Sequence, residues 1–360
     1  MRPARVRFRS HGCSGAGTGA DAVRIAAIVV TYDSAEHLPA CRSGLAAQTH
    51  PSLEVVVVDN ASTDGTRELL ADSLLPATVV LNEENRGFCG GVNDGLTRLS
   101  PQVEGVLLIN PDVVAAPSMV ALLAARLDRD PRLGSVQPTL HRPAHGAGGR
   151  AVLDSCGHEL TTARVVHNRG EGCEDDGRFA GGEVFGTTGA CVLHRRAMLE
   201  DVAWRHPDGR REVLTEDLVA YFDDVELDWR ARCRGWRAVH APEATAVHER
   251  GGAGRRRTAW VEALNWSNRL LVLATCDQPR LRDLPLIAAT TLLQTAELVL
   301  TVPRAVPTAC ARLRLLPAAR RRRRQLLARA RVSPRQVAAQ HAVRFRWTPW
   351  IRTWWRRVRR

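Results

Sequence analysis

The acidic side chains of this chain occur where a folded sheet could gather them. Asp59 and Asp112 closely follow strongly apolar runs, and Asp223, Asp224 and Glu226 form a second acidic cluster much later. Carboxylate oxygens are preferred ligands of Mg²⁺ and Mn²⁺, which often bridge one or two carboxylates to substrate phosphates. A carboxylate can also serve as a general base. The pattern predicts a site for a nucleotide diphosphate and its metal, with acids available for proton transfer.

The elements that would position these carboxylates alternate between strand and helix. Apolar runs predict strands at residues 25–30, 53–58, 79–81 and 106–109, and the segments 34–48, 63–70 and 90–99 between and after them predict helices. Continuously apolar strands that alternate with helices are typical of an α/β fold with a mostly parallel sheet covered on both faces. Such sheets bind ligands at the carboxyl ends of their strands. The four predicted strands all end in polar clusters there.

Glycine spacing argues against a dinucleotide-dependent dehydrogenase. Residues 87–91 read G-x-x-G-G, but they follow the third predicted strand, and the first strand-to-helix turn, residues 31–36, contains no glycine. A Rossmann fold carries its glycine fingerprint in that first turn.

The second half of the chain gives weaker signals. Residues 141–183 predict loops or a small antiparallel extension, and residues 260–273 predict a helix. Residues 284–302 form a nineteen-residue apolar stretch that is broken by Gln294 and Glu297. The length meets the minimum for a membrane span, but the charge and the amide argue against a clean crossing. We expect a helix that lies on a surface or in a core.

The positive charge is concentrated at the C-terminal end. The net charge is +13, yet residues 301–360 contain 18 Arg and no Asp or Glu, so the remaining chain sums to 13 minus 18, or −5. The chain also has no Lys, and a GC-rich genome could therefore account for part of the arginine excess. A mildly acidic body with a basic tail makes nucleic-acid binding a poor inference from total charge.

The cysteines and the N-terminus bear on location. The nine Cys are scattered singly without a C-x-x-C pair, which argues against a disulfide framework or a zinc site and indicates reduced thiols in a cytoplasm. Residues 1–22 contain several Arg but no apolar stretch of the length that a secretory signal needs. We expect residues 1–22 to be a disordered basic extension.

Five segments that carry polar or acidic residues occur in order along the chain. They are IVVTY at 28–32, VVDNASTDG at 57–65, NRGF at 85–88, LLINPD at 107–112 and YFDDVEL at 221–227. In this order they resemble family 2 glycosyltransferases of the bacterial rhamnosyltransferase-like branch. The resemblance covers about residues 24–250, and it extends only weakly to the C-terminal tail. Each segment alone is common, but five in register are specific.

The resemblance implies a GT-A fold, a mostly parallel sheet flanked by helices, that performs inverting transfer from a nucleotide sugar. The glycosyltransferase domain would span residues 23–255, with a nucleotide-binding half at about 23–140 and an acceptor half at about 141–255. A helical extension would follow at 256–302 and an Arg/Trp-rich tail at 303–360. The residues that the resemblance assigns to the nucleotide pocket are Thr31, Tyr32, Asp59, Asn60, Asn85, Gly87 and Asn110.

The resemblance also implies a metal site for Mg²⁺ or Mn²⁺. Asp112 would be the surviving acid of the D-x-D metal motif, because Asn110 stands at its first position. His248 matches a histidine that completes this site in relatives. One carboxylate in place of two would weaken the affinity for the metal.

Asp224 matches the general base of relatives. Its neighbours Asp223 and Glu226 would raise its proton affinity by like-charge repulsion. Relatives carry Glu-Asp-x-Asp where this chain has Asp-Asp-Val-Glu, so the change bears on acceptor placement by Asp223 and Glu226 rather than on the base. Gly189, in the segment 186–190, matches a glycine loop under the donor sugar.

The tail carries four Trp among the seven Arg of residues 344–360. Trp prefers the membrane interface and Arg is attracted to anionic lipid headgroups, so we expect an anchor to an anionic membrane surface. Single-stranded nucleic acid is the less favoured partner, and a disordered tail without a partner is a further alternative. The expected location is cytoplasmic, at the inner face of the plasma membrane.

Two function classes remain open from the sequence. The first is a metal-dependent inverting glycosyltransferase that uses dTDP-rhamnose or a UDP-sugar and acts on a cell-envelope glycan or lipid-linked acceptor. The second is a catalytically weak protein of the same fold whose basic tail binds polyanions. Asn110 and Glu226, the departures from fully acidic motifs, keep the second class open.

Overall fold

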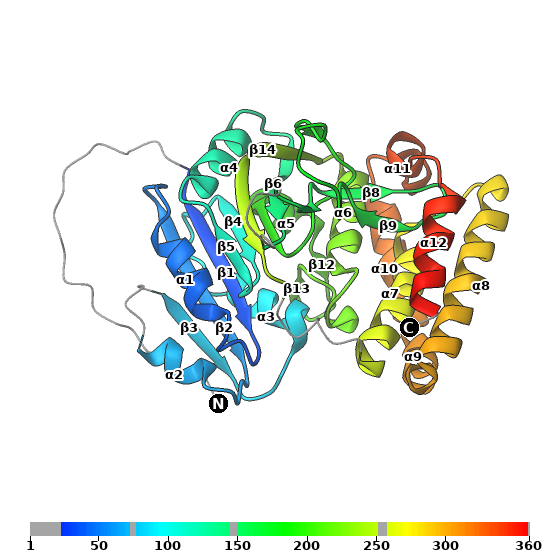
Figure 1. The fold of residues 1–360 in the computed structure, drawn as a ribbon, viewed down its shortest axis with the longest axis horizontal. Helices are drawn as coiled ribbons and strands as arrows, with labels where there is room; N and C mark the ends of the chain where they lie inside the picture. Colours follow the sequence, from blue (N-terminus) through cyan, green and yellow to red (C-terminus); the bar gives the residue numbers. More distant parts are fainter. Residues whose placement is uncertain (1–22, 73–76, 144–149, 251–257, 359–360) are drawn as a thin grey trace.

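A mixed sheet of ten strands forms the centre of the protein (Figure 1). The computed structural model describes residues 23–72, 77–143, 150–250 and 258–358, so the predicted extension 1–22 lies outside the described residues. The strand order is β10-β14-β6-β11-β4-β1-β2-β3, with β5 paired to β14 and β7 to β6. The strands are β1 (Ile25–Thr31), β2 (Leu53–Asn60), β3 (Thr78–Asn82), β4 (Gly105–Ile109), β5 (Val113–Ala115), β6 (Leu133–His141), β7 (Leu153–Ser155), β10 (Gly182–Glu183), β11 (Cys191–Arg195) and β14 (Arg237–His248).

The parallel part of the sheet follows the expectation. β1 pairs in parallel with both β2 and β4, and β2 pairs in parallel with β3. β11 is inserted between β4 and β6 and runs antiparallel to both. The fold is therefore the expected mostly parallel sheet flanked by helices.

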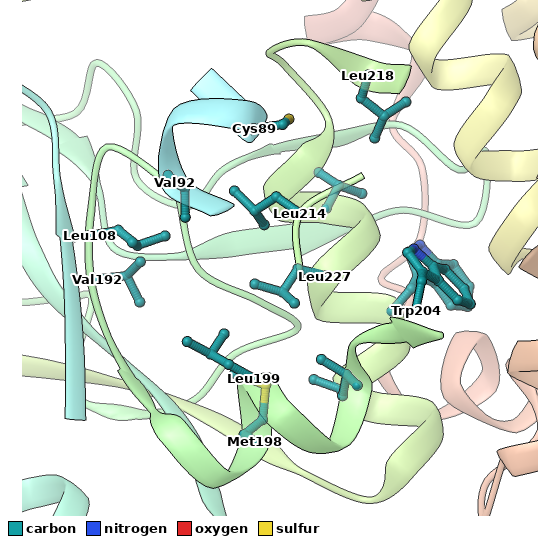
Figure 2. Packing of buried hydrophobic residues seen from close by; sticks show 14 of the residues in the cluster. Cys89, Val92, Leu108, Val192, Met198, Leu199, Trp204, Leu214, Leu218 and Leu227 are labelled. Carbon is teal, nitrogen blue, oxygen red and sulfur yellow. The ribbon is translucent and has the colours of Figure 1, made fainter. Parts of the chain in front are cut away.

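Helices cover both faces of the sheet because its central strands are apolar on both. All seven residues of β1 are buried, and alternate residues belong to two separate core clusters. The helices whose side chains enter one cluster are α1 (Leu38–Ala46), α2 (Thr66–Ala71) and α4 (Met119–Asp128). Those in the other include α3 (Gly87–Leu96), α5 (Arg196–Val202) and α6 (Asp223–Arg234), together with three helices of the C-terminal end described below. Figure 2 shows Cys89 and Val92 of α3 and Leu227 of α6 in this second cluster.

Two small antiparallel pairs lie outside the central sheet, and the first falls within residues 141–183, where the sequence predicts loops or a small antiparallel extension. β8 (His158–Leu160) pairs with β9 (Val166–Asn168), and β12 (Trp204–Arg205) pairs with β13 (Arg211–Glu212). A short 3-10 turn, η1 (Glu216–Leu218), leads toward α6.

Helices at the C-terminal end stand beside the sheet domain (Figure 1). They are α7 (Ala259–Cys276), α8 (Leu284–Thr301), α9 (Val306–Arg312), α10 (Leu316–Arg329), α11 (Pro334–His341) and α12 (Trp347–Val358), joined by the short turns η3 (Leu281–Asp283), η4 (Pro303–Ala305) and η5 (Leu313–Leu315). The alternative of a disordered tail is therefore wrong for residues 303–358. Leu326 of α10 is buried in the main core, and Arg322 pairs with Asp217 and Glu212. Burial and ion pairs order this basic segment.

One helical segment among the described residues, Leu281–Thr301, is long and apolar enough to cross a membrane. Only 11% of its apolar window is buried inside the protein. The segment is therefore not a core helix, and most of its apolar side chains lie on the surface of the protein.

Candidate active site

The carboxyl ends of β1 and β2 bring the predicted nucleotide residues together. The parallel register places Thr31 opposite Asp59. The Asp59 carboxylate accepts hydrogen bonds from the Thr31 hydroxyl at 3.0 Å, from the Ser62 hydroxyl, and from Nε of Arg67 at 2.7 Å. Thr31 and Asp59 are both completely buried. Their side chains brace the ends of the two strands instead of offering free groups to a base.

The N-terminus of α3 is built by three other predicted residues. Asn60 donates its side-chain N–H to the carbonyl of Gly87 at 2.8 Å, and the Asn85 side chain accepts from the Gly87 N–H at 2.8 Å. Gly87 has φ +69° and no room for a Cβ, which would lie 2.6 Å from Val219. Tyr32, by contrast, is 40% exposed at the end of β1. Tyr32 is the member of this group with the most freedom to stack on a ligand.

The predicted metal residues are brought together by the pairing of β5 with β14. The register places His248 opposite Val113, directly after Asp112. Nε2 of His248 lies 3.5 Å from Oδ1 of Asp112, and Nδ1 of His248 lies 2.8 Å from Oδ2 of Asp154. Burial opposes protonation of His248, but the bonds to Asp112 and Asp154 outweigh it and raise the pKa to about 9.

The chemistry of this pair fits a divalent cation. A histidine that ligates a metal typically gives its second ring nitrogen to a carboxylate, as His248 does with Asp154, and this fixes the orientation of the ring. Within the described ranges, no group of three or more His, Cys, Asp or Glu gathers to hold a metal. The oxygen ligands beyond Asp112 and His248 would have to come from a bound diphosphate.

The predicted base, Asp224, lies at the first turn of α6. Its Oδ2 accepts the N–H of Gly189 at 3.0 Å, and its Oδ1 accepts the N–H of Val225 at 2.8 Å. About 22% of the side chain is exposed. The carboxylate is thus fixed by two backbone donors and still open to a reactant.

Gly189 and the next residue join the two ends of the site. Gly189 donates to Asp224, and the carbonyl of Ala190 accepts the N–H of Asn110 at 2.8 Å. The segment 110–112 is therefore attached to Ala190, and the predicted base is attached to the preceding residue, Gly189. In this way Asp112 and Asp224, which are more than 100 positions apart in the sequence, are held at one edge of the sheet.

A buried histidine beside the base was missed by the sequence analysis. Nδ1 of His158 lies 3.0 Å from Oδ2 of Asp228, and Nε2 lies 3.6 Å from Oδ2 of Asp224. Burial opposes protonation of His158, but Asp224 and Asp228 outweigh it and raise its pKa. Burial also raises the pKa of Asp228 to about 6. Asp224 and Asp228 therefore favour the protonated form of His158, which lies beside the predicted base.

The two other acids of the cluster have different surroundings from those expected. Glu226 is buried and its carboxylate pairs with Arg230 at 3.1 Å and accepts the Thr215 hydroxyl at 2.7 Å. Glu226 therefore forms a structural ion pair, and its place in the acceptor or donor-sugar loop stays a prediction. Asp223 is also buried, and burial, followed by the charge of Asp224, raises its pKa well above the ordinary value.

Comparisons with known proteins place the chain in a family. Residues 26–203 match the model of glycosyl transferase family 2. A relative from Mycobacterium tuberculosis, N-acetylglucosaminyl-diphospho-decaprenol L-rhamnosyltransferase, is 26% identical over 271 residues, which are 69% of this chain and 83% of that protein. Residues 26–203 therefore form a glycosyltransferase domain of family 2, and the chain is similar to a rhamnosyltransferase.

Solved structures share the fold at low identity. S. aureus TarS 1-349 in complex with UDP-GlcNAc has a TM-score of 0.51 and 18% identity, and covers 84% of this chain and 89% of that chain. GalNAc-T7 with UDP, GalNAc and Mn²⁺ has a TM-score of 0.55 and 12% identity, and covers 77% of this chain and 52% of that chain. These similarities support the GT-A fold.

Proposed function

We propose that the chain catalyses inverting sugar transfer from a nucleotide diphosphate donor to a hydroxyl of a cell-envelope glycan or lipid-linked acceptor. The observation that carries this proposal is the attachment of Asp224 to Gly189 and of the segment 110–112 to Ala190. It sets a partly exposed carboxylate beside residues that suit a diphosphate and its cation. Inverting transfer needs a base on the acceptor side and charge stabilisation on the leaving-group side.

Each side chain has a separate part in this reaction. Asp224 takes the proton of the acceptor hydroxyl. At the same time the hydroxyl oxygen of the acceptor attacks the anomeric carbon, and the nucleotide diphosphate leaves from the opposite face of the sugar. Nε2 of His158 lies 3.6 Å from Oδ2 of Asp224, so the imidazole helps to orient the carboxylate. Asp112 and His248 would hold Mg²⁺ or Mn²⁺, which supplies stabilisation of the negative charge on the leaving diphosphate.

We infer dTDP-rhamnose as the donor from the relative with rhamnosyltransferase activity in its name. That name also describes an acceptor with a sugar, a diphosphate and a polyprenol, and a lipid-linked diphosphate acceptor is proposed here on the same ground. A UDP-sugar is the second candidate for the donor.

Nucleotide binding provides a direct test of the proposed donor side. A ligand at 100 times its dissociation constant should stabilise the folded protein by about 2.7 kcal/mol. We expect dTDP-rhamnose or a UDP-sugar to raise the melting temperature, and Mn²⁺ to increase the shift. The control omits the sugar nucleotide and contains Mn²⁺ alone. No shift with any dTDP or UDP sugar, with or without Mn²⁺, would favour a protein that has lost donor binding.

The lipid-linked acceptor requires access to a membrane, and the C-terminal helices provide an apolar surface. We define the apolar face of α12 as Trp347, Ile351 and Trp355, which are spaced by four residues and exposed. α12 packs against α8, where Nε1 of Trp354 donates to the carbonyl of Leu293 at 3.1 Å. The exposed apolar side chains of α8 include Leu292, Val299 and Leu300.

We propose that these two helices lie on the anionic inner surface of the plasma membrane. An interfacial helix places its apolar side chains in the acyl boundary and its basic residues near anionic headgroups. Arg344 and Arg346, just before α12, are exposed and suited to the headgroups. Because α8 already packs on α12, both helices would present their apolar side chains together.

Replacing the apolar face of α12 tests this placement. Trp347→Ser, Ile351→Ser and Trp355→Ser together should weaken binding to anionic vesicles by about 100-fold, since burial of these side chains contributes about 3 kcal/mol or more. Sedimentation with vesicles measures the binding. Leu81→Ser, an equally exposed apolar position on β3, is the matched control. Unchanged vesicle binding in the triple variant would sink the proposal, and turnover on a soluble acceptor analogue should remain unchanged.

A further inference from the structure

The segment that leads into the catalytic base has an unusual backbone. Val219, Tyr221 and Phe222 have φ angles of 66°, 67° and 63°. Residues with a β-branched or bulky side chain rarely adopt the left-handed region. Such conformations persist only where the surroundings hold them, and they concentrate at functional sites. The segment 217–222, defined here as the base loop, therefore depends on contacts from outside itself.

A buried side chain of α7 supplies three of these contacts. The amide group of Asn268 donates to the carbonyl oxygens of Leu218 at 2.8 Å, Ala220 at 2.9 Å and Tyr221 at 3.0 Å. Asn268 is completely buried. An amide nitrogen has two hydrogens, so its whole donor capacity is directed at the base loop.

Arg312 of α9 fixes the orientation of this amide. Its Nη2 donates to Oδ1 of Asn268 at 2.7 Å and to the carbonyl of Asp217 at 2.7 Å. Its Nε donates to the hydroxyl of Ser267 at 2.9 Å. A guanidinium can only donate, so Oδ1 of Asn268 must face Arg312 and the N–H groups must face the loop.

The opposite side of the base loop contacts the donor half. The carbonyl of Val219 accepts the N–H of Cys89 at 3.0 Å, and Val219 fills the space where Gly87 lacks a Cβ. Figure 2 shows Cys89 of α3 near Leu218, at the start of this loop. The loop is therefore held between α3, which borders the nucleotide pocket, and the C-terminal helices α7 and α9, and it ends at Asp223 and Asp224.

We propose that Asn268, oriented by Arg312, is a positioning residue for the catalytic base. It holds the base loop in its left-handed conformation, so that α6 begins where Asp224 can face both Gly189 and the acceptor. The C-terminal helices are then required for catalysis in addition to any contact with lipid. This inference rests on the proposed function, because it assigns Asn268 to the transfer reaction.

Asn268→Leu removes the amide and keeps a similar volume. We expect turnover per nucleotide-binding molecule to fall by about 10- to 100-fold, since a misplacement of about 1 Å can cost 100-fold. The KM for the donor and the nucleotide stoichiometry should stay unchanged. Asn265→Leu is the matched control, because Asn265 lies one turn earlier on α7 and donates only to the carbonyl of Val261 in the same helix. A role limited to stability would lower the folded fraction without lowering turnover per binding site.

Arg312→Met provides a second variant in case Asn268→Leu fails to fold. It should lower turnover in the same direction, and the double variant should lose less than the product of the single effects, because both residues act through one amide. If both single variants fold, a double variant whose loss of turnover equals the product of the two single losses would overturn the proposal. Wild-type turnover in either single variant would overturn it as well.

Hydrogen exchange of the peptide covering 216–226 gives a readout that is independent of activity. Exchange should accelerate in Asn268→Leu and Arg312→Met and stay at the wild-type rate in Asn265→Leu. Unchanged exchange in the first two variants would show that Asn268 does not hold the loop. If the wild-type protein transfers no sugar, the proposed function fails while the exchange measurement still decides the structural part.

Discussion

Replacing Asp224 by asparagine is expected to lower sugar transfer by about a thousandfold or more and to leave nucleotide binding nearly unchanged. The substitution keeps the shape of the side chain and an oxygen that can accept the Gly189 N–H, but it removes the group that takes the acceptor proton. The measurement pairs single-turnover transfer with calorimetric titration of the nucleotide. Binding should be retained because Asp224 serves the acceptor.

Asp223→Asn is the matched control for this variant. It makes the same chemical change at the adjacent residue, and burial together with the charge of Asp224 raises the pKa of Asp223 well above its ordinary value. Burial and the charge of Asp224 therefore favour the protonated form of Asp223, and an amide imitates that form without a charge. We expect transfer to stay within a few-fold of wild type. Equal losses in both variants, or loss of nucleotide binding in Asp224→Asn, would contradict the assignment of the base.

Asp112→Asn should produce the second largest loss, about 100-fold or more in transfer. Stabilisation of a leaving diphosphate by a cation supplies several kcal/mol, and each 1.36 kcal/mol corresponds to a factor of ten. In the presence of Mn²⁺, we expect Asp112→Asn to bind the nucleotide more weakly than the wild type does. In the presence of a chelator, the two proteins should bind it equally well. Titration of Mn²⁺ against transfer rate should show a higher requirement for the metal.

Asp154→Asn separates a metal ligand from the residue that orients it. Asp154 contacts Nδ1 of His248 at 2.8 Å and would act on the metal only through that ring. Losses of partners of this kind typically lower metal affinity 10- to 100-fold, so higher Mn²⁺ should restore most of the activity. Wild-type dependence on Mn²⁺ in Asp112→Asn would show that the metal site lies elsewhere.

The parallel half of the fold could be predicted because its signals are local. The runs at residues 25–30 and 53–58 are apolar throughout, and they form β1 and β2 with all of β1 buried. β11 and β14 could not be predicted as neighbours of this sheet, because their partners lie far away in the sequence. The order of the tail could not be predicted for a related reason. Its Trp and Arg residues suggested a membrane anchor, with a disordered tail as an alternative, but residues such as Arg322 find carboxylates only after the chain has folded.

The site shows the same limit. Asp112 and Asp224 were predicted from motifs at the ends of elements, where spacing carries information. Asp154 has no local signal, since its link to His248 arises from tertiary contact alone. Asp228 had a weak signal, because it lies four residues after Asp224 and hence on the same face of a helix.

Exposure is the property that motifs do not report. Asp59 and Glu226 have the residue types expected of a site, but both are buried in complete hydrogen-bond networks. A carboxylate in such a network braces the chain, and a contact with a ligand stays a prediction for both residues. Tyr32 and Asp224 keep part of their surface open, and their candidacy as contact residues follows from that difference.

Consumption of nucleotide sugars by the purified protein tests the central claim most directly. The protein with Mn²⁺ is incubated with a panel of dTDP and UDP sugars, each with and without a polyprenyl-diphosphate sugar acceptor, and release of the nucleoside diphosphate is measured. We expect one donor, dTDP-rhamnose first among the candidates, to be consumed faster with acceptor, and Asp224→Asn to abolish that increase. Absence of nucleotide release from every donor in the presence of acceptor would contradict the assignment of this chain as an active glycosyltransferase.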